Sequence, residues 1–158
     1  MAELSELIKQ PQFSSAAEKA MLNVMATNNW IVRKISDLMG EHDLTMPQYN
    51  VLRILRGSHP ESLTCGEIAE RLLDRTPDVT RLLDRLESAE LVDRRRYQED
   101  RRMMMVSVTD RGLDRLGEMD EEVDALIEDL TRHLSQEEEE TLSRLLEKMR
   151  ADQTIERG

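Results

Sequence analysis

Arginine side chains gather in one short stretch of the chain. Five of the nine residues from 94 to 102 are arginine, in the run RRRYQEDRR. A guanidinium forks onto phosphate or a guanine edge, and it also fits a narrow, electronegative minor groove. The stretch therefore indicates contact with a polyanion, and the candidate contacts are Arg96, Arg101 and Arg102. Asp100 is expected to orient Arg102. The alternative is a solvent-exposed hairpin with surface ion pairs.

A second group of polar residues precedes the arginines, in the segment TPDVTRLLDRLE. Thr76 is a good N-cap and Pro77 suits the first helical position, so we predict a helix that starts there. Its apolar residues at helical spacing are Val79, Leu82, Leu83 and Leu86. The residues expected to face outward and contact DNA are Thr76, Pro77, Asp78, Thr80, Arg81 and Arg85. The alternative is an ordinary amphipathic helix with a solvated charged face.

Two further elements must position these side chains. Before them, Thr64 and Glu67 have capping-box spacing and start a short helix, whose apolar face is predicted to contain Ile68, Ala69, Leu72 and Leu73. After them, residues 91–97 and 103–108 resemble strands and flank a polar tip of hairpin length. This order predicts a helix-turn-helix followed by a β-hairpin wing, an arrangement suited to the major groove and a neighbouring groove of DNA.

The order of these motifs resembles the winged helix-turn-helix of the MarR family (multiple antibiotic resistance regulators), which are bacterial transcription regulators. The matching residues are GEIAERL, TPDVTRLLDRLE, LVDRRR, the pair Asp100 and Arg102, and VTDRG at 108–112. The flanking segments also fit, so the resemblance covers nearly the whole chain. It implies a mainly α fold with a small β-hairpin wing and with N- and C-terminal dimerisation helices. Glu90 departs from the family, which often has glycine there.

We expect one MarR-like domain over residues 1–158. The winged helix-turn-helix would span about 45–109, and the dimerisation helices about 12–40 and 110–152. Start signals are a capping box at Thr45, Thr109 as a cap, and a capping box at Ser135. Residues 40–43 are expected to form a turn. In the helix after Thr109, a coiled-coil seam is predicted from the 3,4 spacing of Leu116, Met119, Val123, Leu126 and Leu130.

Charge is distributed unevenly along the chain. The net charge is −11, but residues 71–102 contain nine arginines and eight acidic residues, which gives +1 and leaves −12 for the remainder. Such a protein should bind DNA only where its geometry fits, with strong salt dependence. Two copies related by a two-fold axis would bind a pseudo-palindromic operator with half-sites about 10 bp apart. The expected function is a sequence-specific, ligand-responsive repressor that acts as a homodimer.

The regulatory signal has two candidates. Asn28, Trp30 and Tyr49 could line a pocket for a small-molecule effector near the cleft that the family resemblance implies. The alternative for the Asn residues and Trp30 is a packed helix interface. Cys65 could sense oxidation, because a helix N-terminus lowers the pKa of a thiol, or it could be a small buried residue. A protein-interaction module on the winged fold is the alternative function.

Several classes of protein do not fit the sequence. The chain lacks a catalytic nucleophile with a nearby base, a phosphate-binding glycine loop and a metal triad, so we expect no enzyme activity, no cofactor and no metal site. Glu41, His42 and Asp43 are adjacent and cannot all point at one ion. One cysteine, no secretory signal and no apolar run of membrane-spanning length suggest a cytoplasmic protein. The family resemblance implies a bacterial protein that joins the nucleoid when it is bound to DNA.

Overall fold

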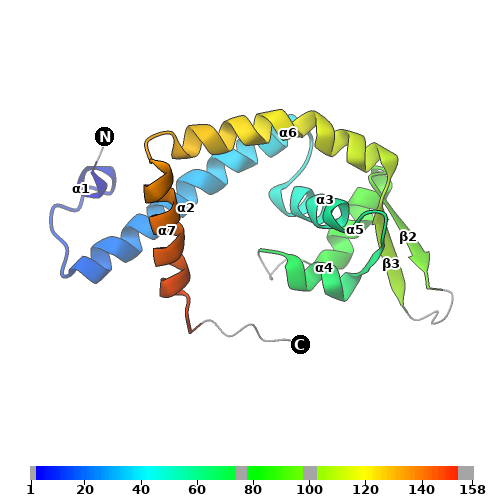
Figure 1. The fold of residues 1–158 in the computed structure, drawn as a ribbon, viewed down its shortest axis with the longest axis horizontal. Coiled ribbons are helices and arrows are strands. Elements are labelled where there is room, and N and C mark those ends of the chain that lie inside the picture. The colour runs from blue at the N-terminus through cyan, green and yellow to red at the C-terminus, as the bar shows by residue number, and fades with distance from the viewer. Residues whose placement is uncertain (1–2, 74–77, 98–102, 153–158) are drawn as a thin grey trace.

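The computed structural model of the chain is mainly helical, with a small sheet at one end (Figure 1). It describes residues 3–73, 78–97 and 103–152. In chain order the elements are α1 (Leu4–Leu7), α2 (Ala16–Glu41), α3 (Met46–Ser58), β1 (Leu63–Thr64), α4 (Cys65–Arg71), α5 (Val79–Ser88), β2 (Val92–Arg96), β3 (Met104–Val108), α6 (Asp110–Thr131) and α7 (Gln136–Met149). The expected mainly α fold with a β-hairpin is confirmed.

Local hydrogen bonds set where several helices begin. The Thr45 amide donates to Gln48 Oε1 at 2.8 Å, and the Gln48 amide donates back to Thr45 Oγ1 at 3.4 Å. Thr64 with Glu67, and Ser135 with Glu138, form the same reciprocal pair at α4 and α7. Each pair satisfies two backbone donors that a helix start leaves free. The three predicted capping boxes are confirmed.

The sheet has three antiparallel strands in the order β1-β3-β2. In the β2–β3 hairpin Val92 lies opposite Val108 and Arg96 lies opposite Met104. The alternation of β3 buries Val106 and Val108, whereas Met104 near the hairpin tip is exposed. The sequence predicted the hairpin but not β1, because two residues are too few to show a strand pattern. The arrangement therefore anchors one end of the hairpin in the core and projects the other outward (Figure 1).

The hydrophobic core joins the small helices, the sheet and the first turns of α6. Its fully buried members include Val51, Leu52, Leu55, Ile68, Leu83, Leu86, Val106, Leu116 and Met119. Leu116 and Met119 belong to the predicted coiled-coil seam, but they pack inside this core. Val123 is only partly buried against it. The first residues of this 3,4 pattern on α6 are therefore buried in the chain's own core, and the pattern continues along the helix beyond that core.

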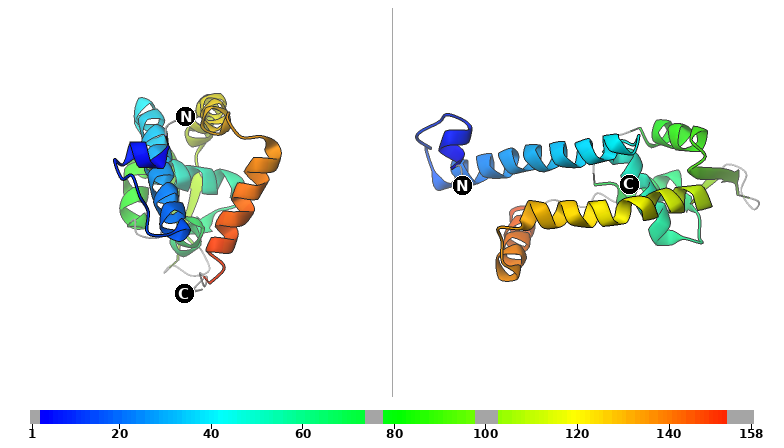
Figure 2. Two further views of the ribbon diagram at one scale, coloured as in Figure 1. Left: turned by 90° about the vertical axis from the view of Figure 1, so that its left-hand side faces the viewer. Right: turned by 90° about the horizontal axis from the view of Figure 1, so that it is seen from above.

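The two long helices, α2 and α6, extend away from the core in the same direction (Figure 2, right). Much of their apolar surface stays uncovered: Val24, Met25 and Trp30 on α2 and Ile127 on α6 are exposed. These side chains are therefore not covered by other parts of the described chain. No helix among the described residues is long and apolar enough to cross a membrane.

Two predicted boundaries are wrong. Helix α2 continues through Gly40 and Glu41, so the predicted turn is shorter and the positive φ of 55° falls on Asp43. The hydrogen bond from the Leu44 amide to the Met39 carbonyl closes the helix end, and both side chains are buried. Helix α4 ends at Arg71, and Leu73 is 78% exposed rather than part of the buried face.

Candidate nucleic-acid interface

Helix α5 begins later than the sequence predicted. Its N-cap is Asp78, whose carboxylate accepts a hydrogen bond from the Arg81 amide at 3.3 Å. The predicted start at Thr76 and Pro77 is therefore wrong, and those two residues themselves lie outside the described residues. An aspartate cap satisfies a free amide as threonine would, and its negative charge suits the positive end of the helix dipole.

The two faces of α5 differ sharply in character. Leu83 and Leu86 are fully buried, with Val79 and Leu82 partly buried beside them, as predicted. The opposite face exposes Thr80, Arg81 and Arg85. Asp78, Arg81, Leu82 and Arg85 line a shallow depression of about 220 Å³. The buried leucines fix the helix in the core, so its cationic face has a defined position.

The cationic groups on this face remain available. Within residues 3–73, 78–97 and 103–152, the guanidinium groups of Arg81, Arg85 and Arg96 form no ion pair. Arg96 is exposed at the end of β2, toward the hairpin tip. The other predicted wing contacts, Arg101 and Arg102, and the predicted supporting residue Asp100 lie outside the described residues. Arg81, Arg85 and Arg96 can therefore meet an anionic partner without first breaking a salt bridge to another described residue.

Arg94 has a different role from the arginines around it. Its side chain is 19% exposed and bonds to two carboxylates of α5, reaching Asp84 at 2.6 Å and Glu87 at 2.9 Å. These carboxylates raise the pKa of Arg94, with the Glu87 hydrogen bond as the largest cause. The predicted cluster of cationic wing residues is thus smaller than the sequence suggested. Arg94 ties the wing to α5, and Arg95 pairs with Asp93 at 2.7 Å.

A tight turn joins α5 to the wing. The Leu91 amide donates to the Leu86 carbonyl and the Glu90 amide donates to the Glu87 carbonyl, which closes the helix end. Glu90 adopts a φ of 61°, a conformation that glycine reaches without steric cost. The resemblance had identified Glu90 as the departure from a family glycine, and the backbone here has the conformation that favours one.

The start of α6 holds this turn in place. Thr109 Oγ1 donates to the Glu90 carbonyl at 2.7 Å, and the Thr109 amide donates to the Leu91 carbonyl at 3.1 Å. A Cβ added to Gly112 would lie 2.3 Å from the Leu91 carbonyl oxygen, so only glycine allows this approach. The α5–β2 turn is therefore fixed from α6 as well as from the core.

A larger pocket lies between α2 and the start of α3. It has a volume of about 640 Å³ and is lined by Asn28, Val32, Ser36, Leu44, Thr45, Met46, Pro47 and Leu73. Asn28, a predicted pocket residue, is among them, whereas Trp30 and Tyr49 are not. Trp30 is exposed, and Tyr49 is half-buried near Arg53 and Arg56, where burial raises its pKa.

Two other residues singled out in the sequence are in ordinary settings. Cys65 is the first residue of α4 and packs, half-buried, against the core. His42 Nε2 lies 3.2 Å from a carboxylate oxygen of Glu122, so the ring links the end of α2 to α6. Among the described residues, no hydrogen bond joins that ring to the adjacent Glu41 or Asp43.

The fold is that of winged helix-turn-helix proteins. The MarR family model matches residues 44–104. TcaR of Staphylococcus aureus, an HTH-type transcriptional regulator, is 30% identical over 122 residues, which cover 76% of this chain and 79% of TcaR. The chain belongs to the MarR family of transcription regulators. A second regulator, TtmR of Methylorubrum extorquens, is 39% identical over 88 residues, which cover 56% of this chain and 44% of TtmR.

Solved structures agree with this assignment. A MarR transcription factor from Planctomyces limnophilus is 37% identical with a TM-score of 0.68, and the match covers 86% of this chain and 98% of that one. MepR of S. aureus, solved in complex with DNA, is 26% identical with a TM-score of 0.75, over 89% of this chain and 99% of MepR. The similarity thus extends over the long helices as well as the winged module.

Sequence reasoning missed two features of this region. It did not predict that Arg94 pairs with Asp84 and Glu87, which share one face of the preceding helix. It also missed that Gln48 faces a space next to α5 and α6 in addition to capping α3. Both features depend on contacts between elements, which no local pattern encodes.

Proposed function

We propose that this protein is a sequence-specific, double-stranded DNA-binding repressor that acts as a homodimer and responds to a small molecule. The observation that carries the proposal is the outer face of α5, where Arg81 and Arg85 are exposed and free of ion pairs in the described chain. Phosphate contacts by such residues supply affinity, and contacts to base edges supply specificity. Helix α5 is the recognition helix in this proposal.

The wing contributes a second contact to the proposed complex. Arg96 lies exposed on β2, and the sequence adds Arg101 and Arg102 beyond it. The Arg94 bonds to α5 keep the base of the wing at a fixed angle to the recognition helix. We infer that α5 enters the major groove while the wing arginines reach the neighbouring groove.

The proposed dimer uses the apolar surface that the described chain leaves uncovered. Helix α7 has no buried residue and stands apart from α2 (Figure 2). A groove of about 610 Å³ lies between α6 and α7, and its apolar lining residues are Ile127, Leu134, Leu142 and Leu146. Contiguous apolar surface of this kind is costly in water. A second copy would cover it and hold two recognition helices about one DNA turn apart, at half-sites about 10 bp apart.

The proposed effector site is the pocket between α2 and α3. Its volume of about 640 Å³ falls within the range for small-molecule sites, and Asn28 and Ser36 supply polar groups among apolar ones. Leu73, which lies between α4 and α5 in the chain, forms one wall of the pocket. A ligand there would contact Leu73, shortly before the proposed recognition helix, so its binding energy can bias DNA affinity.

The proposal is tested by mobility shift on promoter fragments with matched arginine variants. Arg81→Ala should weaken binding by about 1–3 kcal/mol and relax base preference if Arg81 reads a base edge. Arg102→Ala should weaken binding on all sequences and reduce the salt slope by about one. Arg53→Ala removes the same charge from an exposed site on α3 and should leave affinity unchanged.

Two outcomes would overturn the proposal. If Arg81→Ala and Arg102→Ala bind the same fragments as tightly as the unchanged protein, α5 and the wing do not contact DNA. If the protein binds no promoter fragment more tightly than random DNA at low salt, a protein-interaction role on the winged fold replaces the regulator role. Repeating the shift after mild peroxide treatment, with Cys65→Ser as the control, tests the redox alternative.

A further inference from the structure

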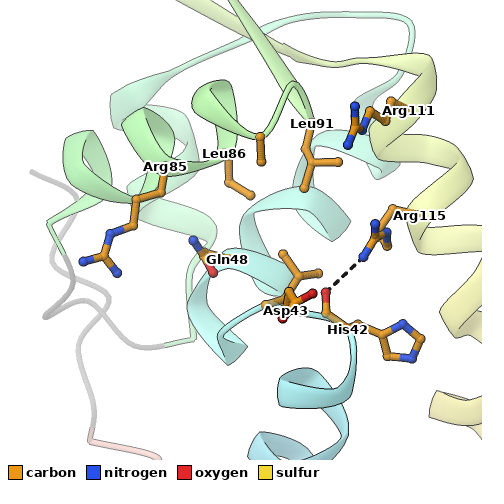
Figure 3. Close-up of a pocket in the computed structure, with 10 residues that line it drawn as sticks. His42, Asp43, Gln48, Arg85, Leu86, Leu91, Arg111 and Arg115 are labelled. Atoms are coloured by element: carbon orange, nitrogen blue, oxygen red, sulfur yellow. Dashed lines mark hydrogen bonds between the residues drawn. The ribbon is translucent and has the colours of Figure 1, made fainter.

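The outward side of α5 contains an acidic residue as well as cationic ones. Arg81 and Asp84 are both exposed, and their spacing of three residues places them next to each other on the helix surface. Figure 3, a close-up of the pocket beside Gln48, shows how the helix is oriented: Leu86 points toward the interior, whereas the guanidinium of Arg85 points away from it. Asp84 therefore lies on the side of α5 that faces away from the core, one turn after Arg81.

Only one oxygen of the Asp84 carboxylate is bound within the described chain. Oδ1 accepts a hydrogen bond from Nη2 of Arg94 on the wing at 2.6 Å. The other oxygen, Oδ2, accepts no hydrogen bond from any described residue, and the side chain is 57% exposed. Arg94 thus holds the carboxylate in place and leaves one of its two acceptors open to a partner outside the chain.

The bond to Arg94 is not enough to explain an acidic residue at this position. Glu87, which is half-buried, accepts from both Nε and Nη2 of Arg94. Without Asp84, Arg94 would therefore keep two of these hydrogen bonds. In the proposed complex an exposed carboxylate is repelled by DNA phosphates, so Asp84 lowers the affinity unless it also makes a favourable contact with the duplex.

The base edges of the major groove differ in what they offer to a carboxylate. Cytosine presents its N4 amino group, a donor, without an acceptor of its own beside it. Adenine presents its N6 amino group next to the N7 acceptor, and guanine and thymine present acceptors. A carboxylate accepts hydrogen bonds but cannot donate them, so it is attracted to cytosine and repelled by the acceptors of the other three bases.

We propose that Asp84 is a specificity-determining residue, whose Oδ2 accepts a hydrogen bond from the N4 amino group of one cytosine in each half-site. This inference rests on the proposed function, in which α5 lies in the major groove. Arg81 precedes Asp84 by about 4.5 Å along the helix axis, at ~1.5 Å per residue. The two side chains therefore reach the same or adjacent base pairs, where the fork of Arg81 suits guanine and the carboxylate suits cytosine.

Selection of bound sequences from a random DNA pool, with the full chain and two Asp84 variants, tests the proposal. The unchanged protein should enrich cytosine at one position of each half-site. In Asp84→Asn the new amide both donates and accepts, which fits N6 and N7 of adenine, so the preference at that position should change from cytosine to adenine. Asp84→Ala removes the contact and should leave the four bases equally frequent there.

Mobility shift measures the strength of this contact. Replacing the selected cytosine with thymine puts an acceptor where the donor was. The replacement should weaken binding by the unchanged protein roughly tenfold and binding by Asp84→Ala less than about twofold. Asp84→Asn keeps an acceptor for Arg94, so the junction with the wing is retained in at least one of the two variants.

Glu87→Gln is the matched control. It weakens the same junction with Arg94 from a half-buried position on α5, and it should leave the base preference unchanged. If Glu87→Gln relaxes the cytosine position as much as Asp84→Ala does, the orientation of the wing sets the preference and the proposal is wrong.

Two further results would overturn the proposal while leaving the proposed function standing. One is specific DNA binding with the same base preferences in the unchanged protein and in both Asp84 variants. The other is an affinity that rises equally on all sequences in Asp84→Ala, because the carboxylate would then only repel phosphates. If the unchanged protein enriches no sequence at all, the proposed function itself is contradicted, and this inference falls with it.

Discussion

The guanidinium of Arg94 on β2 donates from both Nε and Nη2 to the carboxylate of Glu87 on α5. Nη2 also reaches Asp84, one turn earlier on the same helix face. The wing and α5 are therefore joined by charge-assisted bonds in addition to the core beneath them. This junction sets the distance between α5 and the wing, and so, in the proposed complex, which DNA grooves they can occupy together.

Replacement of Arg94 tests this junction. Arg94→Met keeps much of the aliphatic stem and removes all three hydrogen bonds, so we expect the free energy of unfolding to fall by about 1–2 kcal/mol. Arg95→Met is the control: Arg95 is 83% exposed and its pair with Asp93 should contribute at most about 0.5 kcal/mol. Urea denaturation of both variants measures the difference. Equal losses in the two variants would contradict a special role for Arg94.

Two glycines of α6 provide a matched pair. Gly112→Ala places a Cβ against the Leu91 carbonyl, so the α5–β2 turn must shift, and we expect a loss of roughly 1–3 kcal/mol in stability. At Gly117 nothing lies within 4 Å of an added Cβ, and Gly117→Ala should stabilise the helix by about 0.5–1 kcal/mol. Thermal unfolding of both variants measures whether each substitution lowers or raises the stability. A neutral Gly112→Ala would mean that the turn adjusts freely.

Glu90 stores backbone strain at the end of α5. Its φ of 61° costs an L-residue about 1–2 kcal/mol relative to glycine, whereas its exposed ion pair with Arg111 contributes less than about 1 kcal/mol. Glu90→Gly should therefore raise the free energy of unfolding by about 0.5–1 kcal/mol. Glu90→Ala loses the same ion pair without relieving the strain and should not stabilise. Stabilisation by alanine as large as that by glycine would refute the strain argument.

The capping box of α4 predicts a pH dependence. Hydrogen bonds from the Thr64 amide and then the Thr64 hydroxyl lower the pKa of Glu67 below its ordinary value of 4.5. A carboxyl with a lowered pKa in the folded state contributes stability that is complete above pH 4.5 and is lost as the pH falls through its folded pKa. The stability of Glu67→Gln, which keeps an acceptor, should fall less steeply below that pH. If the stabilities of the unchanged protein and of Glu67→Gln fall in parallel below that pH, Glu67 is not the source of the pH dependence.

Elements whose signals are local could be predicted from the sequence. The capping boxes at Thr45, Thr64 and Ser135 were identified because both partners lie three residues apart. The buried face of α5 followed from helical spacing in the same way. On the functional side, the exposure of Thr80, Arg81 and Arg85 was predicted by exclusion from that face, and the structure places them there.

Features that depend on contacts between distant segments could not be predicted. Strand β1 exists because Leu63 and Thr64 pair with Val106 and Met105 of β3, far along the chain. The N-cap of α5 is Asp78 and not the predicted Thr76. Aspartate and threonine both cap helices, so the local sequence could not decide between them. The inward role of Arg94 and the pocket beside Gln48 arise where α5 meets β2 and α6.

The proposed function requires two copies of α5 to read one duplex together. Selection of bound sequences from a random DNA pool, with the number of chains per duplex measured by sedimentation, tests this directly. We expect two chains per duplex on an inverted repeat whose half-site centres lie about 10 bp apart. A single chain bound to an unrepeated site, or no enrichment of any sequence over the starting pool, would contradict it.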